Sequence, residues 1–260
     1  PIYMGFLMTE PNSISCTQLA ETYNISHDSV NRFLEREDYT PHDLYQEAIQ
    51  HIDNNKLIVS IDDTVLDKPY SQHMDLVSYF WSGKHHRSVK GINLITLYAT
   101  DQNGQNIPIN FRIYDKSEGK TKNDYFMDML SEVLSWGAKI QFITGDSWYS
   151  STGNLKTIRK YGIRFMFGID CNRKVSPEKG QWFQLRLLPN FHQGQVVWLK
   201  DFGFVQLFKT QLKEQQRFYI VHQDEDDLLS FEGFHELHSS HWKIEQYHRV
   251  IKQVCHIEKF

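Results

Sequence analysis

Acidic residues follow two apolar runs of the sequence, and a third acid lies in a helical stretch near its end. The run "KLIVSID" ends at Asp62 and is followed by Asp63, "KIQFITGD" ends at Asp146, and "HSSHWKIEQYHRVIKQ" contains Glu245. Open α/β sheets carry their chemistry at strand ends, so two strands that end in aspartate would bring carboxylates to one edge. Converging carboxylates repel one another unless hard cations neutralise them, and Mg²⁺ prefers oxygen ligands. This pattern predicts two ions that serve phosphodiester transfer.

The stretch around Glu245 predicts an amphipathic helix. His241, Glu245, His248 and Lys252 are spaced i, i+4, i+7 and i+11, which places them on one face. The glutamate would point towards the cations, Lys252 would hold a phosphate as a point charge, and Arg249 would add a second contact. A zinc site is the alternative, but no cysteine or ordered His-x3-His pair with a third ligand supports it. Its ligands would be His235, His238, His241 and His248.

The elements that must position these acids follow a mixed α/β order. "KLIVSID", "LITLYAT" and "IPINFRIY" are strand-like, "DYFMDMLSEVLSWG" is typical of a helix, "KIQFITGD" of a strand, "NLKTIRKYG" of a helix and "IRFMFGID" of a strand. Residues 170–225 interrupt this alternation with the strand-like runs "QVVWLKDF", "FVQLFKT" and "RFYIVHQ". We therefore predict an α/β catalytic domain over residues 51–260 with an inserted all-β segment at 170–225.

Residues 1–50 are predicted to form a small helical region. Within residues 13–37, "TQLAETY" and "DSVNRFLER" have apolar residues at helical spacing and are separated by "NIS". Such a pair resembles a helix-turn-helix, whose second helix enters the major groove and would place Asn31 and Arg32 near DNA. An ordinary helical hairpin is the open alternative, because short helix pairs are common.

A basic segment lies between the first two predicted strands. Residues 76–100 contain no acid, and they include Lys84, Arg87 and Lys90 close to the aromatic run from Tyr79 to Trp81. This composition predicts a surface for the DNA backbone with stacking groups nearby. A solvated loop is the alternative.

Composition sets outer limits on the class of protein. A chain of 260 residues that is 40% apolar can bury a full core, and its formal charge of −4 with 13 histidines does not by itself decide for or against nucleic acid. No apolar run reaches the roughly 18 to 20 residues that cross a bilayer, and no signal peptide is recognisable, so we expect a cytoplasmic protein without a membrane partner. The three cysteines are far apart and odd in number, and we expect buried thiols.

The segments "IDDT", "GDSWY" and "HWKIEQYHRVIK" resemble the DDE transposases of bacterial insertion sequences, in the subgroup with a Tyr-x2-Arg-x3-Glu-x6-Lys motif. Glu245 and Lys252 match the second half of that motif, whereas His238 and His241 stand at its tyrosine and arginine. The resemblance covers residues 56–260 and implies an RNase H-like core with Asp62, Asp146 and Glu245 as catalytic metal ligands. A histidine holds phosphate only when protonated and with fewer donors than arginine.

The same resemblance implies a function and its partners. It implies cleavage and strand transfer at insertion-sequence ends with two Mg²⁺ or Mn²⁺ ions, a homodimer on double-stranded DNA, and association with the bacterial nucleoid. Asp63 remains a rival of Asp62, because neighbouring residues of a strand point to opposite faces. An RNase H-like nuclease without joining activity is one alternative function. A catalytically inactive DNA-binding fragment is another, because the chain starts at Pro1 and two motif positions are replaced.

Overall fold

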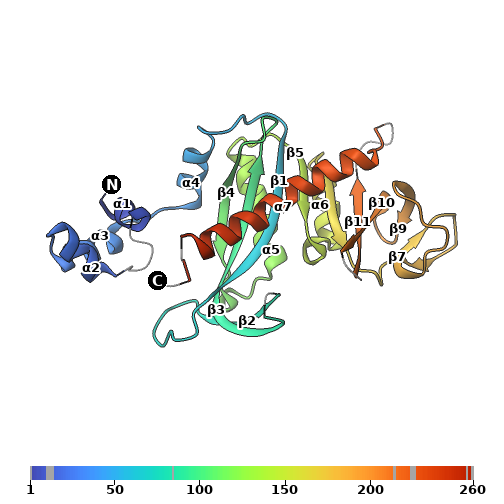
Figure 1. Cartoon of the computed structure of the whole chain (residues 1–260). Coiled ribbons are helices and arrows are strands. Elements are labelled where there is room, and N and C mark those ends of the chain that lie inside the picture. The colour runs from blue at the N-terminus through green and yellow to red at the C-terminus, as the bar shows by residue number, and fades with distance from the viewer. Residues whose placement is uncertain are drawn as a thin grey trace.

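The structure, a computed structural model, describes residues 2–9, 15–83, 85–212, 215–222, 227–255 and 257–258 (Figure 1). Its helices are α1 (Ile2–Thr9), α2 (Cys16–Tyr23), α3 (His27–Arg36), α4 (Pro41–Ala48), α5 (Lys122–Ser135), α6 (Thr152–Lys160) and α7 (Phe231–Gln253). Its strands are β1 (Leu57–Asp67), β2 (Ser78–Ser82), β3 (Arg87–Thr100), β4 (Asn106–Ile113), β5 (Ile140–Gly145), β6 (Arg164–Ile169), β7 (Lys174–Ser176), β8 (Phe183–Gln184), β9 (Gln195–Leu199), β10 (Gly203–Leu212) and β11 (Gln215–His222).

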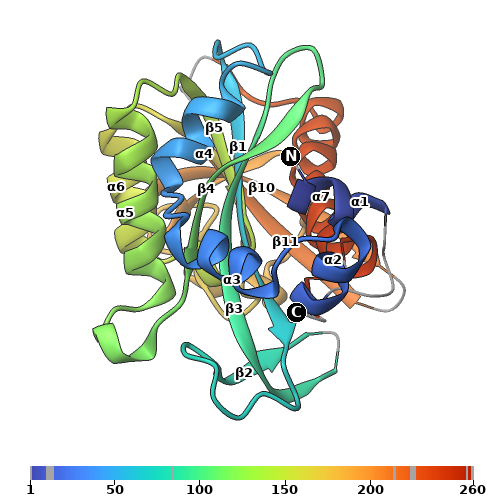
Figure 2. The ribbon, with the colours of Figure 1, turned by 90° about the vertical axis from the view of Figure 1, so that its left-hand side faces the viewer.

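The described strands form one eleven-stranded sheet with helices on both faces. Its order is β2-β3-β1-β5-β6-β11-β10-β9-β7-β8, and β4 pairs with β3. Strand β1 is antiparallel to β3 and parallel to β5, which in turn is parallel to β6. Figure 2 shows α5 and α6 on one side of this sheet and α7 on the other. The mixed α/β prediction is therefore confirmed.

Strand β1 is longer than the sequence predicted. We expected Asp62 and Asp63 to end the strand, but residues 64–67 continue it and pair with Gly91–Leu94 of β3. The prediction of a strand end was wrong because residues 64–67 continue the pairing with β3, and the β-branched Thr64 and Val65 suit a strand. Both aspartates consequently lie inside β1, where their backbone pairs with Thr96 and Ile95 of β3.

Helix α5 covers one face of the central strands. Thr121 and Asp124 form a capping box at its start, each side chain bonding the other residue's backbone N–H. The buried side chains recur at three- and four-residue spacing, which is the pattern of a helix packed on a sheet. They are Tyr125, Phe126, Met129, Leu130 and Val133.

The inserted strands continue the central sheet. Strand β11 pairs antiparallel with β6, and β10 and β9 follow outward. Phe208 of β10 stacks on Phe234 of α7, with ring centroids 4.5 Å apart, and Tyr219 of β11 contacts the same ring. Helix α7 is thus held on the insertion by its first turns and reaches across β5 and β1 with its remainder. The insertion therefore helps to place the part of α7 that carries Glu245.

The N-terminal helices have a small core of their own. Phe6, Leu19 and Val30 are buried together in it, and Figure 1 shows α1, α2 and α3 set apart from the sheet. Ser15 accepts a hydrogen bond from the Gln18 N–H at the start of α2, and α2 ends at Asn24 in the left-handed conformation. The predicted pair of short helices around a turn is confirmed.

The cysteines and the absence of a membrane-spanning helix in the described residues bear on two further expectations. Cys171 and Cys255 are exposed, so the expectation of buried thiols was wrong for them, because both lie in segments outside the regular elements. In the described part of the chain, no helix combines the length and the apolar character that a bilayer span requires.

Candidate active site

Asp62 and Asp146 come from neighbouring parallel strands at the same level. Ile61 of β1 pairs with Gly145 of β5, and the two aspartates are the next residues of each chain segment. Asp146 leaves the strand and caps the following turn, accepting a hydrogen bond of 2.9 Å from the Trp148 N–H. The two carboxylates are therefore neighbours at the level where β5 ends and β1 continues.

A glycine of β6 lets the Asp146 turn pass close to the sheet. A Cβ at Gly168 would lie 2.9 Å from the backbone nitrogen of Ser147 and 3.3 Å from the carbonyl carbon of Asp146. Real Cβ atoms hardly ever approach backbone so closely, so a larger residue at position 168 would displace this turn. The position of the second acid thus depends on a residue that carries no chemistry itself.

Asp62 points towards α7. One carboxylate oxygen of Asp62 lies 3.3 Å from Nδ1 of His248, and the other accepts a hydrogen bond of 2.8 Å from the Asp63 N–H. His248 is buried, and its Nε2 lies 3.2 Å from the hydroxyl of Thr96, the residue paired with Asp62 on β3. The side chain of Asp62 is consequently held on the α7 face of the sheet.

Asp63 points to the opposite face and is occupied there by three donors. Its carboxylate accepts hydrogen bonds from Asn93 Nδ2 at 2.7 Å, from Lys122 Nζ at 2.6 Å and from the Tyr149 hydroxyl at 2.9 Å. Tyr149 is fully buried, and its pKa is raised well above the usual value by burial and by the nearby charge of Asp63. The three donors therefore hold Asp63 within the fold. Asp62 is the acid on the side of Glu245.

Glu245 lies between two histidines that dock α7 onto the sheet. His241 Nδ1 is 3.2 Å from the hydroxyl of Thr144 on β5, and His248 contacts β1 and β3. Glu245 follows His241 by four residues and precedes His248 by three, so all three share one face of the helix. The half-buried Glu245 therefore lies on the face of α7 that packs on β1 and β5.

The acids interact through their charges. The pKa of Asp146 is raised to about 7 by burial and then by the charges of Asp62 and Asp63, although its side chain stays open to solvent. The pKa of Glu245 is raised to about 7 by burial and by the charge of Asp62, against the lowering effect of Arg217 and Arg249. Asp62 is thus electrostatically close to both other acids. A cluster of this kind favours either protons or cations.

The donor chemistry of this cluster fits a hard divalent cation. Asp62, Asp146 and Glu245 offer carboxylate oxygens, which Mg²⁺ and Mn²⁺ prefer, and their repulsion would be relieved by positive charge. Within the described residues, however, no three histidine, cysteine, aspartate or glutamate side chains are gathered closely enough to hold one ion. The acids are near neighbours, and their side chains are not closed around a common point.

The two histidines at the replaced motif positions do not face a phosphate. His241 is buried against Thr144, and burial lowers its pKa to about 4, so the ring is neutral near pH 7. His238 Nε2 lies 3.0 Å from the hydroxyl of Tyr219, and burial again lowers its pKa. The prediction that these side chains contact phosphate is not supported, because α7 turns both towards the sheet and a neutral imidazole lacks the required charge.

The two predicted cations of α7 have different surroundings. Arg249 is exposed beside Glu245, where its charge lowers the pKa of the glutamate. Lys252 donates a hydrogen bond of 2.6 Å to the Val65 carbonyl and lies 3.6 Å from the Glu258 carboxylate. Arg249 is therefore open to a ligand, and Lys252 ties the end of α7 to β1.

The predicted basic segment maps to the β2–β3 hairpin. Arg87 is exposed at the start of β3, and Lys90 donates a hydrogen bond to the Ser71 carbonyl. Lys84, the third predicted cation, lies outside the described residues. Phosphate binding by these residues stays a prediction.

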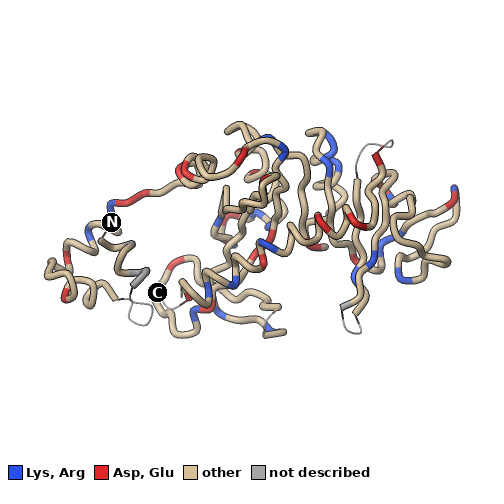
Figure 3. The backbone as a smooth tube through the Cα atoms, turned by 45° about the horizontal axis from the view of Figure 1, so that its top comes forward, with Lys and Arg blue, Asp and Glu red and all other residues tan. Residues whose placement is uncertain are grey.

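The predicted DNA-contacting residues of α3 bond within their own helix. Asn31 Nδ2 lies 3.3 Å from His27 Nδ1, and Arg32 donates to the Asp28 carbonyl. Acidic and basic positions are mixed along α3, where Glu35 lies three residues after Arg32 (Figure 3). The second helix of the predicted pair is present as α3, and DNA binding by this region stays a prediction.

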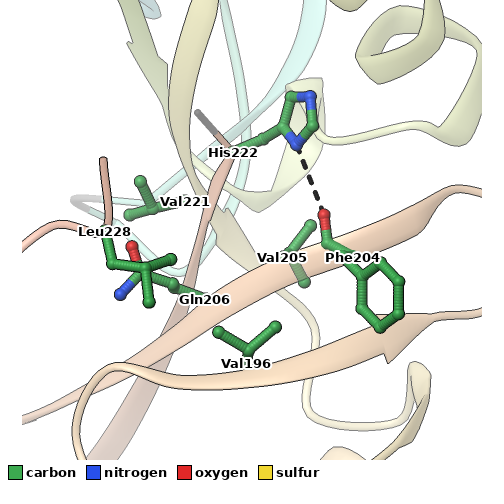
Figure 4. Close-up of a pocket in the computed structure, with 7 residues that line it drawn as sticks. All are labelled: Val196, Phe204, Val205, Gln206, Val221, His222 and Leu228. Carbon is green, nitrogen blue, oxygen red and sulfur yellow. Dashed lines mark hydrogen bonds between the residues drawn. The ribbon is translucent and has the colours of Figure 1, made fainter. Parts of the chain in front are cut away.

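An apolar cavity of about 260 Å³ lies in the inserted strands (Figure 4). Val196, Phe204 and Leu228 line it, and the His222 ring bonds the Phe204 carbonyl at its rim. None of the predicted acids lines this cavity. It is therefore a separate feature of the insertion.

The contacts of His248 and Lys122 were not predicted from the sequence. His248 was placed on the face of Glu245 by its spacing, and that spacing was the available signal for a contact with a strand acid. Lys122 lies 59 residues after Asp63, and no local pattern indicates that they pair.

Comparison with known proteins identifies the family. The model of the transposase DDE domain family matches residues 53–260. No curated protein matches the chain. Similar solved structures include Marinitoga piezophila Argonaute in complex with a 5′ OH guide RNA and target DNA, at 9% identity and a TM-score of 0.27 over 70% of this chain. The same Argonaute with guide RNA alone has 11% identity and a TM-score of 0.27 over 74% of this chain.

This chain spans about a quarter of the length of those Argonaute chains, 25% and 26% respectively. The predicted RNase H-like mixed sheet with flanking helices and inserted strands is confirmed by the sheet order and by the family. Since the family model matches most of the sequence, the chain belongs to the transposase DDE domain family.

Proposed function

We propose that this protein is a DNA transposase that cleaves DNA at the ends of an insertion sequence and joins the freed 3′-hydroxyl to target DNA. The observation that carries the proposal is that three acids from β1, α7 and the residue after β5 lie near one another beside the end of β5. In a transposase-family domain, we assign the catalytic role to Asp62, Asp146 and Glu245.

These three residues would hold two Mg²⁺ or Mn²⁺ ions. Bound ions of this kind activate an attacking oxygen and stabilise a leaving oxygen in phosphodiester chemistry. The chain's own contribution is position: His248 and the Asp63 N–H orient Asp62, and the Trp148 N–H orients Asp146. The exposed guanidinium of Arg249 beside Glu245 suits a phosphate of the bound strand.

The partners belong to the same proposal. Double-stranded DNA carrying the element's terminal repeats and the target is the proposed substrate, and a homodimer on paired ends, located on the bacterial nucleoid, is the proposed assembly. Membership of the transposase DDE domain family supports these proposals.

The test compares the natural chain with Asp146→Asn on DNA that carries the flanking element ends. We expect Mg²⁺-dependent nicking by the natural chain and none by the variant, while both bind the DNA similarly. Asp128→Asn is the matched control, since Asp128 is exposed on α5 and pairs with Lys120 away from the three acids. Undiminished nicking by Asp146→Asn would refute the assignment. Nicking without joining of a pre-cut 3′-hydroxyl end would favour the nuclease alternative.

A further inference from the structure

The hairpin of β2 and β3 extends beyond the rest of the sheet. Gly91 of β3 pairs with Asp67, the last residue of β1, and also with Ser78, the first residue of β2. Past this point β3 pairs with β2 alone, and Figures 1 and 2 show the resulting two-stranded ribbon projecting from the body. The ribbon is therefore joined to the sheet at one end and extends from it.

One face of the ribbon is buried and the other presents two aromatic rings. Phe80 is 6% exposed, and its ring centroid lies 5.9 Å from that of Tyr114. Tyr79 and Trp81, on either side of Phe80 in the sequence, are each 65% exposed. Residues two apart on a strand share a face, about 7 Å from one another. The exposed face thus carries two rings in a row, each with most of its surface open among the described residues.

The exposed rings lie on the same side of the sheet as the proposed catalytic acids. Trp81 pairs with Ser88, and Asp62 pairs with Thr96, in registers without a shift between these positions. Directly paired residues share a face, and Ser88 and Thr96 are an even number of residues apart on β3. Because Asp62 and Thr96 both contact His248, this common side is the side of α7.

The spacing along β3 gives the separation of the two sites. Eight residues of strand from Thr96 to Ser88 correspond to about 27 Å. At the rise of about 3.4 Å per nucleotide of a duplex strand this distance corresponds to about eight nucleotides, and a more extended unpaired strand covers it with fewer. The rings are thus beyond reach of the scissile phosphate itself and within reach of the strand that leaves it.

Ring chemistry and charge select the occupant. Aromatic side chains stack on nucleobases of any sequence, but bases in a duplex are already stacked on one another. No acid occurs between residues 76 and 100, Arg87 is exposed at the outer end of β3, and Lys90 lies across from Tyr79. Strand addition by a second copy is less favoured, because Lys116 Nζ already bonds the Tyr79 carbonyl of the edge strand at 2.8 Å.

We propose that the β2–β3 ribbon binds unpaired nucleotides of the DNA strand next to the cleavage site, with one base stacked on Tyr79 and one on Trp81. The proposal rests on the proposed function, since it takes DNA to be the substrate. It adds a binding site for single-stranded DNA, which the cleavage reaction itself does not require. Unpaired strands arise wherever the ends of a cut duplex are separated.

The test measures fluorescence anisotropy of labelled DNA in EDTA. One probe is a blunt duplex, and the other is the same duplex with an unpaired tail of about 12 nucleotides, within the range of single-strand sites. We expect the natural chain to bind the tailed probe more tightly. Trp81→Ala and Tyr79→Ala should each reduce that preference at least about fivefold, the low end of one stacking interaction.

Two variants control the measurement. Trp81→Phe keeps a ring and should retain most of the preference for the tailed probe. Tyr161→Ala removes an aromatic ring of similar exposure, 47%, from the end of α6 and should leave the preference unchanged. Thermal unfolding of each variant shows whether it is folded. Equal preference for the tail in the natural chain, Trp81→Ala and Tyr79→Ala would overturn the proposal.

Two further outcomes are distinguishable. If Trp81→Ala converts a dimer of the natural chain into a monomer, in light scattering without DNA, the rings form a contact between copies and the proposal is wrong. Because the binding assay contains no metal, its result is independent of cleavage. Loss of tail preference in the variants of a protein that never cleaves would support the ribbon site and contradict the proposed function. If the natural chain cleaves DNA and the Trp81→Ala and Tyr79→Ala variants keep its preference for the tailed probe, the result would support the proposed function and contradict the ribbon site.

Discussion

Replacing Glu245 by glutamine should stabilise the metal-free protein above neutral pH. The folded state raises the pKa of Glu245 from 4.5 to about 7, so it holds the proton more tightly than the unfolded state does. A raised carboxyl pKa favours folding while the group is protonated, and this contribution is lost as the pH rises from about 4.5 through about 7. Above that range the charged glutamate destabilises the fold. Glutamine keeps the shape and removes this charge.

The size of the effect follows from the shift. A pKa that moves from 4.5 to about 7 corresponds to at most about 3.4 kcal/mol. Glu245 is only half-buried, and solvent screening reduces this to about 1 to 2 kcal/mol. For a domain of this size we expect Tm in EDTA at about pH 8 to rise by about 2 to 8 °C. Near pH 4.5 the difference should vanish.

Calorimetry of the natural chain, Glu245→Gln and Glu236→Gln provides the assay. Glu236 lies on the exposed side of the same helix, so its replacement should leave Tm nearly unchanged. Mg²⁺ should raise the Tm of the natural chain, because a ligand of the folded state stabilises it, and raise that of Glu245→Gln less. A Tm for Glu245→Gln at or below that of the natural chain at pH 8 in EDTA would refute the electrostatic reasoning.

Two further predictions concern the framework of the site. Lys122→Met should lower the free energy of unfolding by about 2 to 4 kcal/mol in urea titration, because it leaves the carboxylate of Asp63, 17% exposed, without its cation. Lys120→Met, which removes a lysine 49% exposed, should cost under about 1 kcal/mol, and equal losses would contradict this. Gly91→Ala should lower the free energy of unfolding by about 1 to 3 kcal/mol and speed hydrogen exchange in the β2–β3 hairpin, because the added Cβ would overlap the Leu66 carbonyl. Gly83→Ala is the control, since its added Cβ would meet open space, and it should change neither quantity.

The sequence predicted most of the central elements because their apolar patterns are local. Strands β5 and β6 lie within one residue of the predicted bounds, and α6 begins and ends two residues earlier than predicted. Strand β2 was not predicted, since "SYFWS" is short and has only Phe80 and Ser82 buried. The extension of β1 past Asp63 was also missed, because its pairing partner lies in a segment read as a basic loop.

The site could be predicted in part for the same reason. Helical spacing placed His241, Glu245 and His248 on one face, and the structure shows the two histidines of that face in contact with the sheet. Whether Asp62 or Asp63 faces α7 could not be decided, because alternation fixes only that they differ. That choice depends on the direction of the entire sheet relative to α7, which is set by packing between elements distant in sequence.

The replaced motif positions limit where positive charge for DNA can come from. His238 and His241 are directed at Tyr219 and Thr144, and their lowered pKa values keep them neutral near pH 7. Lys122 is committed to Asp63 on the far face of the sheet. At the three proposed catalytic acids the described chain therefore offers DNA mainly negative charge, which ions bound there would reverse. Attraction for the rest of the strand must then come from outside the acid cluster, and the exposed Arg249 of α7 and Arg87 of the ribbon lie in positions to supply it.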